Sequence, residues 1–88
     1  MDNLESLAEN SLKGALEALL LVSSDPVSAS QLSAVLDVAP GEVASLLAEL
    51  KVEYEEANRG FQLREVAGGW RLFTHPAFHE QVEAFVLS

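Results

Sequence analysis

Apolar side chains recur at intervals of three and four residues in the first two thirds of the chain, which is the spacing of an amphipathic helix. The first stretch starts near Ser11 and ends at residues 23–26, where Pro26 removes a backbone donor. Its apolar positions are Leu12, Leu16, Leu19 and Leu20. Residues 1–10 hold few apolar side chains and no capping signal, so we expect them to form a flexible lead-in to the first helix.

Two more helices follow in the pattern. Ser28 is a good N-cap with Gln31 three residues later, which predicts a second helix of about two to three turns. Pro40 lies at or just before the first position of a third helix that runs to about Ala57. The apolar stripes of the two helices are Leu32, Val35 and Leu36, followed by Val43, Leu46, Leu47, Leu50 and Tyr54.

After Gly60 the apolar period changes to two, which predicts a β-hairpin over residues 61–74. A two-residue turn at Gly68-Gly69 would bury one face of the hairpin and expose the other. The core face would hold Phe61, Leu63, Trp70 and Leu72, and the outer face Gln62, Arg64, Val66, Arg71 and Phe73. A three-residue turn would set Glu65 opposite Arg71 and expose Trp70, so we favour the two-residue turn.

Thr74, His75 and Pro76 open a short C-terminal helix whose apolar positions are Phe78, Val82, Phe85 and Val86. Three helices, a two-stranded wing and a short final helix are the order of an α+β fold, the winged helix-turn-helix. We therefore expect residues 11–88 to form one winged-helix domain.

The charge balance disfavours nucleic acid as a partner. The chain holds 14 acidic and 5 basic residues, for a net charge of -9. A winged helix that binds DNA presents Arg, Lys, Asn or Gln from its third helix. Here that helix presents Glu42, Glu49, Glu53 and Glu56, with Lys51 as its one positive charge. A DNA-binding transcriptional regulator has the same fold and is the alternative class. Because of the acidic third helix, we expect no direct nucleic-acid contact from this domain.

The residue types do not indicate an enzyme, a cofactor or a metal site. Serines are plentiful but lack the sequence context of a catalytic nucleophile, and the chain has no cysteine, as is common in the reducing cytoplasm. His75, His79, Glu80 and Glu83 lie close together, but their spacing matches no metal-binding pattern. The apolar run 15–22 is interrupted by Glu17 and too short to span a bilayer, so we expect a soluble cytoplasmic protein without membrane contact.

Apolar side chains outside the predicted core define a candidate protein interface. Gly14, Ala18 and Leu21 line a second edge of the first helix. On the outer face of the wing, Val66 and Phe73 are flanked by Arg64 and Arg71. Ordinary edge packing, or cover by the C-terminal helix, is the alternative for both surfaces. The candidate interface residues are Gly14, Ala18, Leu21, Val66, Arg71 and Phe73.

A set of segments in a fixed order carries a resemblance to a known family. The segments are residues 12–13 and 15–23, residues 25–28 with Leu32, Val43 with Leu46, Leu47, Leu50 and Tyr54, and the glycine-rich hairpin 60–72 followed by Thr74 and Pro76. Together, residues 12–86 resemble the first winged-helix domain of the bacterial segregation and condensation protein B family.

The resemblance implies a non-enzymatic subunit of the condensin-like complex that acts in chromosome condensation and segregation. Family members carry two winged-helix domains and form a homodimer. They bind the kleisin subunit, of the segregation and condensation protein A type, and through it the SMC ATPase at the nucleoid. We therefore expect this chain to be the N-terminal half of a two-domain protein, with homodimerisation and kleisin binding as its activities.

Overall fold

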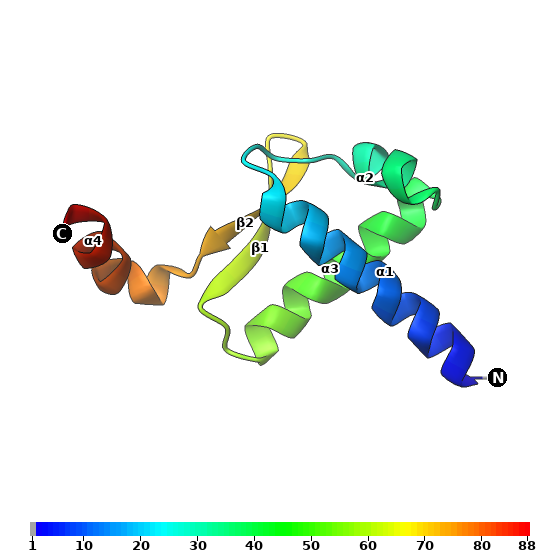
Figure 1. Cartoon of the computed structure of the whole chain (residues 1–88), viewed down its shortest axis with the longest axis horizontal. Coiled ribbons are helices and arrows are strands. Elements are labelled where there is room, and N and C mark those ends of the chain that lie inside the picture. The colour runs from blue at the N-terminus through cyan, green and yellow to red at the C-terminus, as the bar shows by residue number, and fades with distance from the viewer. Residues whose placement is uncertain (1) are drawn as a thin grey trace.

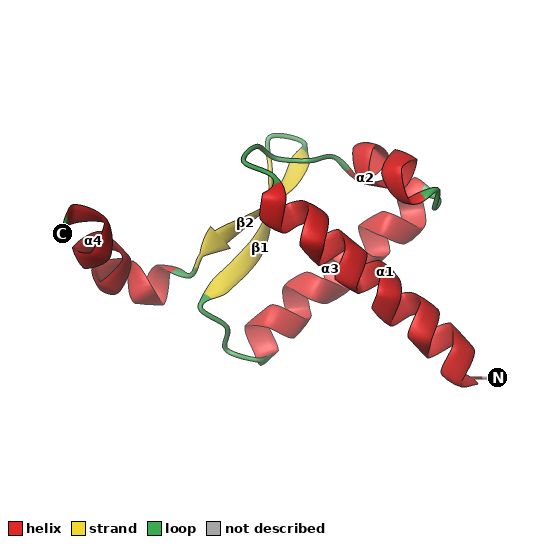
Figure 2. Ribbon diagram, in the orientation of Figure 1, coloured by secondary structure: helices red, strands yellow, loops and turns green. Residues whose placement is uncertain are grey.

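The computed structural model describes the backbone of residues 2–88 and the side chains of residues 9–88. Its elements are α1 Asp2–Val22, α2 Ala29–Leu36, α3 Pro40–Glu56, β1 Phe61–Val66, β2 Gly69–Thr74, the 3-10 turn η1 Pro76–Phe78 and α4 His79–Leu87 (Figure 1). The two strands form an antiparallel hairpin beside the crossed helices α1 and α3 (Figure 2). The predicted α+β winged helix-turn-helix is confirmed.

Helix α1 is longer than the apolar pattern predicted. It begins at Asp2, whereas the predicted start lay near Ser11, so that boundary is wrong. Residues 4–9 are mostly Leu, Glu and Ala, which have high helix propensity, and they contain no glycine or proline to stop the helix. Met1 lies outside the described residues, and the flexibility of the lead-in stays a prediction.

The ends of α2 and α3 follow from local sequence as predicted. Ser28 forms a capping box with Gln31: the Gln31 amide donates to the Ser28 Oγ at 3.1 Å, and the Ser28 amide donates to the Gln31 Oε1 at 2.9 Å. Pro40 occupies the first turn of α3, where its missing N–H costs nothing. Asn58, with a φ of 53°, carries the chain away from the end of α3.

The wing has the predicted faces but a different turn. Ala67 and Gly68, with φ angles of 50° and 74°, form the two-residue turn, so the predicted turn at Gly68-Gly69 is wrong by one position. Val66 pairs with Gly69, and Leu63 with Leu72. Moving a two-residue turn by one position shifts the strand pairing by two residues, which leaves every side chain on its predicted face.

Gly69 is needed in the strand rather than in the turn. A Cβ atom there would lie 2.9 Å from the backbone nitrogen of Val27 and 3.0 Å from the carbonyl carbon of Pro26. The missing side chain lets the loop between α1 and α2 pass against β2. Val27 and Trp70 then exchange two backbone hydrogen bonds of 2.9 and 2.7 Å, which fasten the wing to that loop.

The core lies between the three helices and the inner face of the wing. Its buried apolar residues are Leu16, Leu20, Leu32, Val43, Leu46, Leu47, Leu50, Tyr54, Leu63 and Trp70. All five predicted stripe residues of α3 are among them. In contrast, Val35 of the predicted α2 stripe and Phe61 of the predicted core face are exposed.

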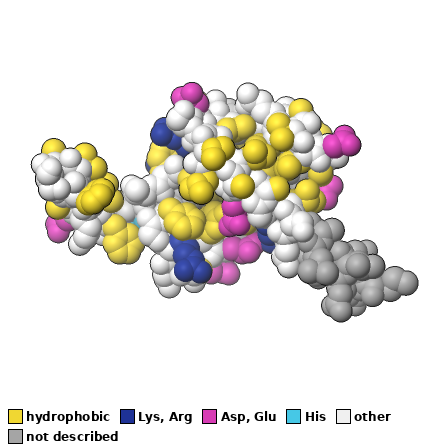
Figure 3. Space-filling model, in the orientation of Figure 1, with side chains coloured by type: hydrophobic (Ala, Val, Ile, Leu, Met, Phe, Trp, Pro, Cys, Tyr) yellow, Lys and Arg dark blue, Asp and Glu magenta, His cyan; other side chains and the backbone are white. Residues whose placement is uncertain are grey.

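Helix α4 projects away from this core (Figure 1). The radius of gyration is 14.5 Å, compared with about 12 Å for a compact domain of this length. Hydrophobic side chains are visible on the surface of the projecting helix (Figure 3). Phe85 is 82% and Val86 is 72% exposed. The C-terminal helix therefore does not cover the body of the domain.

Candidate functional site

A groove of about 330 Å³ lies between the C-terminal end of α1 and strand β2. Its lining residues are Leu20, Leu21, Ser23, Phe61, Arg71, Leu72, Phe73 and Thr74. Leu21 comes from the helix surface and Phe73 from the wing surface that the apolar pattern left as alternatives. The fold brings these two candidates, together with Arg71, into one site.

The other candidate residues lie outside this groove. Gly14 and Ala18 are exposed on earlier turns of α1, and a Cβ atom on Gly14 would meet no neighbour within 4 Å. Val66 lies half-buried at the turn end of β1, away from the Thr74 end where the groove opens. Gly14, Ala18 and Val66 therefore do not line the groove, and a role for them in an interface stays a prediction.

Three residues that line the groove, Leu20, Phe61 and Leu72, were predicted to belong to the core. Leu20 is buried, but Phe61 is 39% exposed because it stands at the open end of the hairpin. There its ring packs edge-on against Tyr54, with the ring centroids 4.9 Å apart. The position of Phe61, as first residue of its strand, was the available signal that it would lie at the rim.

Two arginines lie directly opposite each other on the outer face of the wing. Arg64 pairs with Arg71 across the strands, and their guanidinium carbons lie 5.1 and 5.3 Å from the centre of the Phe73 ring. Like charges directly opposite each other destabilise a sheet, and the contacts with the ring offset part of that cost. In residues 9–88 neither arginine forms an ion pair, and Arg71 lines the groove.

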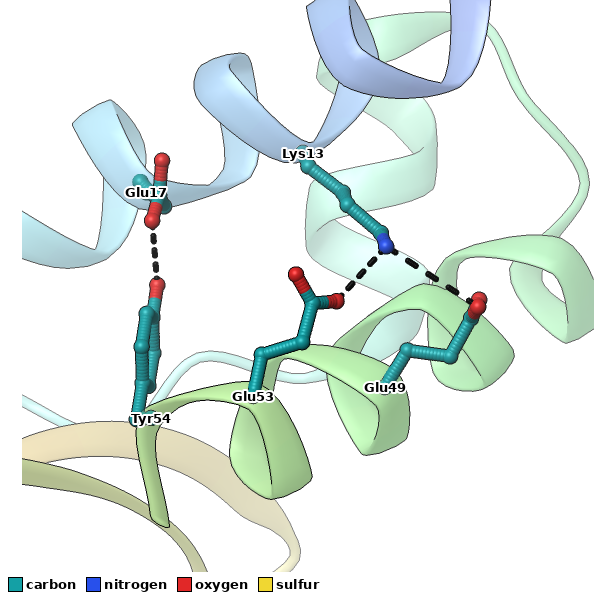
Figure 4. Close-up of polar contacts among 5 residues, drawn as sticks. All are labelled: Lys13, Glu17, Glu49, Glu53 and Tyr54. Atoms are coloured by element: carbon teal, nitrogen blue, oxygen red, sulfur yellow. Dashed lines mark hydrogen bonds and ion pairs between the residues drawn. The ribbon is translucent and has the colours of Figure 1, made fainter. Parts of the chain in front are cut away.

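One and two turns before Leu21, polar side chains of α1 contact α3 (Figure 4). Lys13 Nζ donates to Glu53 Oε2 at 2.6 Å and lies 3.9 Å from Glu49 Oε1. One turn on, the Tyr54 hydroxyl donates to Glu17 Oε2 at 2.6 Å. Glu49 and Glu53, which were predicted to point outward from α3, therefore contact α1, although both side chains stay exposed.

These contacts shift the pKa values of both donors. The hydrogen bond with Glu53 raises the pKa of Lys13 above its usual value. Burial of the ring, followed by the hydrogen bond to Glu17, raises the pKa of Tyr54 well above its usual value. Both groups are therefore protonated at neutral pH, and they connect α1 to α3.

The histidines near the C-terminus serve local structure. His75 Nδ1 accepts a hydrogen bond of 3.0 Å from the Ala77 amide and so caps η1. His79 Nε2 lies 3.0 Å from Glu83 Oε2 on the next turn of α4. Within the part of the chain that the structure describes, no three His, Cys, Asp or Glu side chains gather as a metal site would require. None of the described helices combines the length and apolarity needed to cross a membrane.

Fold and groove together define a winged helix-turn-helix domain with a largely apolar groove on its surface. Comparison with known families places it further. The model of the family described as segregation and condensation complex subunit ScpB matches residues 14–88, so the chain belongs to the ScpB family. The resemblance found in the sequence is confirmed.

Relatives support this assignment in sequence and in structure. A segregation and condensation protein B from Moorella thermoacetica is 46% identical over 77 residues, which cover 88% of this chain and 40% of that protein. One from Syntrophotalea carbinolica is 48% identical over 71 residues, which cover 81% of this chain and 36% of that protein. The chain thus spans well under half of these relatives.

Two solved structures have the same fold. ScpB from Mycobacterium tuberculosis superimposes with a TM-score of 0.87 and 37% identity, covering 90% of this chain and 49% of that one. The second, described as a dimer of the ScpB N-terminal domain complexed with ScpA peptide, gives a TM-score of 0.84 and 32% identity. That match covers 89% of this chain and 98% of the other, so the two chains have nearly the same extent.

Proposed function

We propose that this chain is a non-enzymatic subunit of the bacterial SMC-kleisin complex that condenses and segregates chromosomes. In this proposal residues 11–88 form the N-terminal winged-helix domain, which forms a homodimer and binds a kleisin segment of the ScpA type. The main support is the similarity to an ScpB N-terminal domain that is a dimer complexed with ScpA peptide. A chromosome-bound role would place the protein in the cytoplasm, at the nucleoid.

Surface complementarity is the mechanism that the geometry supports. Leu21 is 77% exposed on one wall of the α1–β2 groove, and Phe73 and Arg71 form the other wall. Burying such apolar side chains against a partner removes apolar surface from water, which favours association. The guanidinium of Arg71 can then bind a carboxylate at the rim, which adds orientation and specificity.

Sedimentation of the domain across a concentration series, with and without a kleisin-type peptide, tests this function. We expect a dimer at micromolar concentrations and saturable peptide binding. Leu21→Asp and Phe73→Asp should weaken self-association or peptide binding, whereas Val35→Asp, at an exposed site on α2, should leave both unchanged. A strict monomer that binds no peptide would contradict the proposal.

The DNA-binding alternative makes an opposite prediction. Arg64 and Arg71 are too few for strong phosphate binding, and the exposed face of α3 retains Glu42 and Glu56. Titration with duplex DNA at low salt should show no saturable binding. Micromolar binding that weakens steeply with added salt would instead favour a DNA-binding role.

A further inference from the structure

Helix α4 has an apolar stripe that the described part of the chain leaves largely uncovered. Val82, Phe85 and Val86 follow helical spacing, so they lie along one side of the helix. Phe85 and Val86 are largely exposed, and the aromatic ring of Phe78 just before the helix is 44% exposed. A nine-residue helix is marginal in water unless its apolar side packs against something.

The α1–β2 groove has the complementary features. Its walls are apolar at Leu20, Leu21 and Phe73, and Arg71 at its rim has no acidic partner in residues 9–88. At about 100° per residue, Glu83 lies roughly 110° from the centre of the α4 stripe, beside it, and Glu80 lies roughly 170° away, on the opposite side. An acidic group therefore borders the stripe of α4, and a basic group borders the groove.

We propose that α4 of one copy of this chain docks in the α1–β2 groove of a second copy, and that the second α4 docks in the first groove. The apolar stripe fills the groove, and Glu83, which in the single chain contacts the exposed His79 imidazole, pairs with Arg71 of the other copy. This inference rests on the proposed homodimer and names the surface through which it forms.

Three observations select a second copy as the occupant. The α4 helix projects away from α1 and β2, the elements that form its own groove, beyond a connection of His75 and η1 (Figure 1). Its acidic border matches the unpaired arginines of the wing. Moreover, a structural neighbour of nearly the same extent is a dimer. Reciprocal exchange of one element between two copies is a closed two-fold arrangement, which is the commonest symmetry of oligomers.

A charge swap tests the pairing directly. Arg71→Glu and Glu83→Lys should each weaken self-association by about tenfold or more, because each places like charges in contact. The double variant R71E/E83K should recover most of the affinity. An equimolar mixture of the two single variants should form heterodimers, because both contacts are then between opposite charges.

The matched control is Glu80→Lys, which makes the same change in net charge on the opposite side of α4. It should leave the dimer affinity within about twofold of the unsubstituted chain. Circular dichroism checks that each variant is folded. Since the chain has no cysteine, a mixture of Leu21→Cys and Phe85→Cys chains gives a second readout, with an expected disulfide-linked heterodimer.

The outcomes separate this inference from the proposed function. Recovery in the double variant and the mixture, with the cross-link, supports the exchange. An unsubstituted dimer that tolerates both single variants and forms no cross-link overturns the exchange and leaves the homodimer standing. If Arg71→Glu abolishes only binding of a kleisin-type peptide, the peptide occupies the groove and the exchange is wrong. A monomer at high concentration overturns both the exchange and the proposed homodimer, and a monomer that also binds no peptide overturns the proposed function as a whole.

Discussion

Helices α3 and α4 carry the same signal in the sequence and have opposite environments in the structure. Each has apolar residues at intervals of three and four. Every member of the α3 stripe is buried, while Phe85 and Val86 of α4 are largely exposed. Periodicity thus shows that a helix has a side to be covered, and says nothing of whether the cover comes from the same chain.

Amide hydrogen exchange should show the largest difference between the two helices. In dilute solution we expect α4 amides to exchange with little protection, because the main contacts of the helix are with η1, which directly precedes it in the chain. Amides in the middle of α3 should require opening of the whole domain, at about 5–15 kcal/mol. Equal protection of the two helices in a dilute monomer would contradict the contrast.

Truncation of one side chain in each helix gives the next largest effect. Leu47→Ala, at a fully buried position, should lower the free energy of unfolding by about 2–5 kcal/mol. Phe85→Ala should change it by less than about 0.5 kcal/mol when measured by urea unfolding below the dimerisation range. A loss at Phe85 comparable to that at Leu47 would place α4 within the folded unit.

Removal of the Tyr54 hydroxyl tests the polar contacts that hold α3 to α1. Tyr54→Phe should cost about 1 kcal/mol at neutral pH, because the Glu17 carboxylate loses its donor. The folded-state pKa of Tyr54 is raised, so the unfolded chain loses this proton first as the pH rises above about 10, and stability falls there.

Lys13 acts in the same direction. Its raised folded-state pKa gives a stabilisation that is complete below about pH 10.4 and is lost as the pH rises through the folded value. The unsubstituted domain should therefore lose stability between about pH 10 and 12, and Tyr54→Phe should flatten that decline. Urea unfolding across this range measures both effects, and identical slopes for the two proteins would refute the role of Tyr54.

The smallest expected effect concerns the exposed edge of α1. Gly14→Ala should raise the free energy of unfolding by about 0.5–1 kcal/mol, because alanine favours the helix and its Cβ atom meets no neighbour. Dimer affinity should not change, since Gly14 lies outside the groove. A weaker dimer, detected by sedimentation, would show that this edge of α1 belongs to the interface, as the sequence suggested.

Much of the fold was predictable because the chain is locally consistent. The capping box at Ser28, the proline at the start of α3 and the alternation after Gly60 each depend on neighbours in sequence. The turn of the wing was misplaced because Gly69 serves a distant contact, with Pro26 and Val27, that no local pattern records. The early start of α1 was missed because a helix needs no capping residue to begin.

The groove was predictable in its parts and not in its assembly. Leu21, Arg71 and Phe73 were recognised as surface residues, but Leu21 lies about fifty residues before the other two in sequence, and the packing of β2 against α1 brings them together. The uncovered state of α4 was not foreseen either. Its stripe is of ordinary composition, and nothing in the sequence distinguishes it from a helix that packs on its own domain.

The contact between Gly69 and the loop at Pro26 and Val27 has a consequence for the speed of association. It holds the wing against the loop that follows α1, so α1 and β2, which form the two walls of the groove, are fixed relative to each other. A preformed site has little ordering entropy to lose when a partner arrives. The association rate constant of a partner at the groove should then lie in the usual range for protein docking, about 10⁵–10⁷ M⁻¹s⁻¹. The affinity should then be set by the dissociation rate constant.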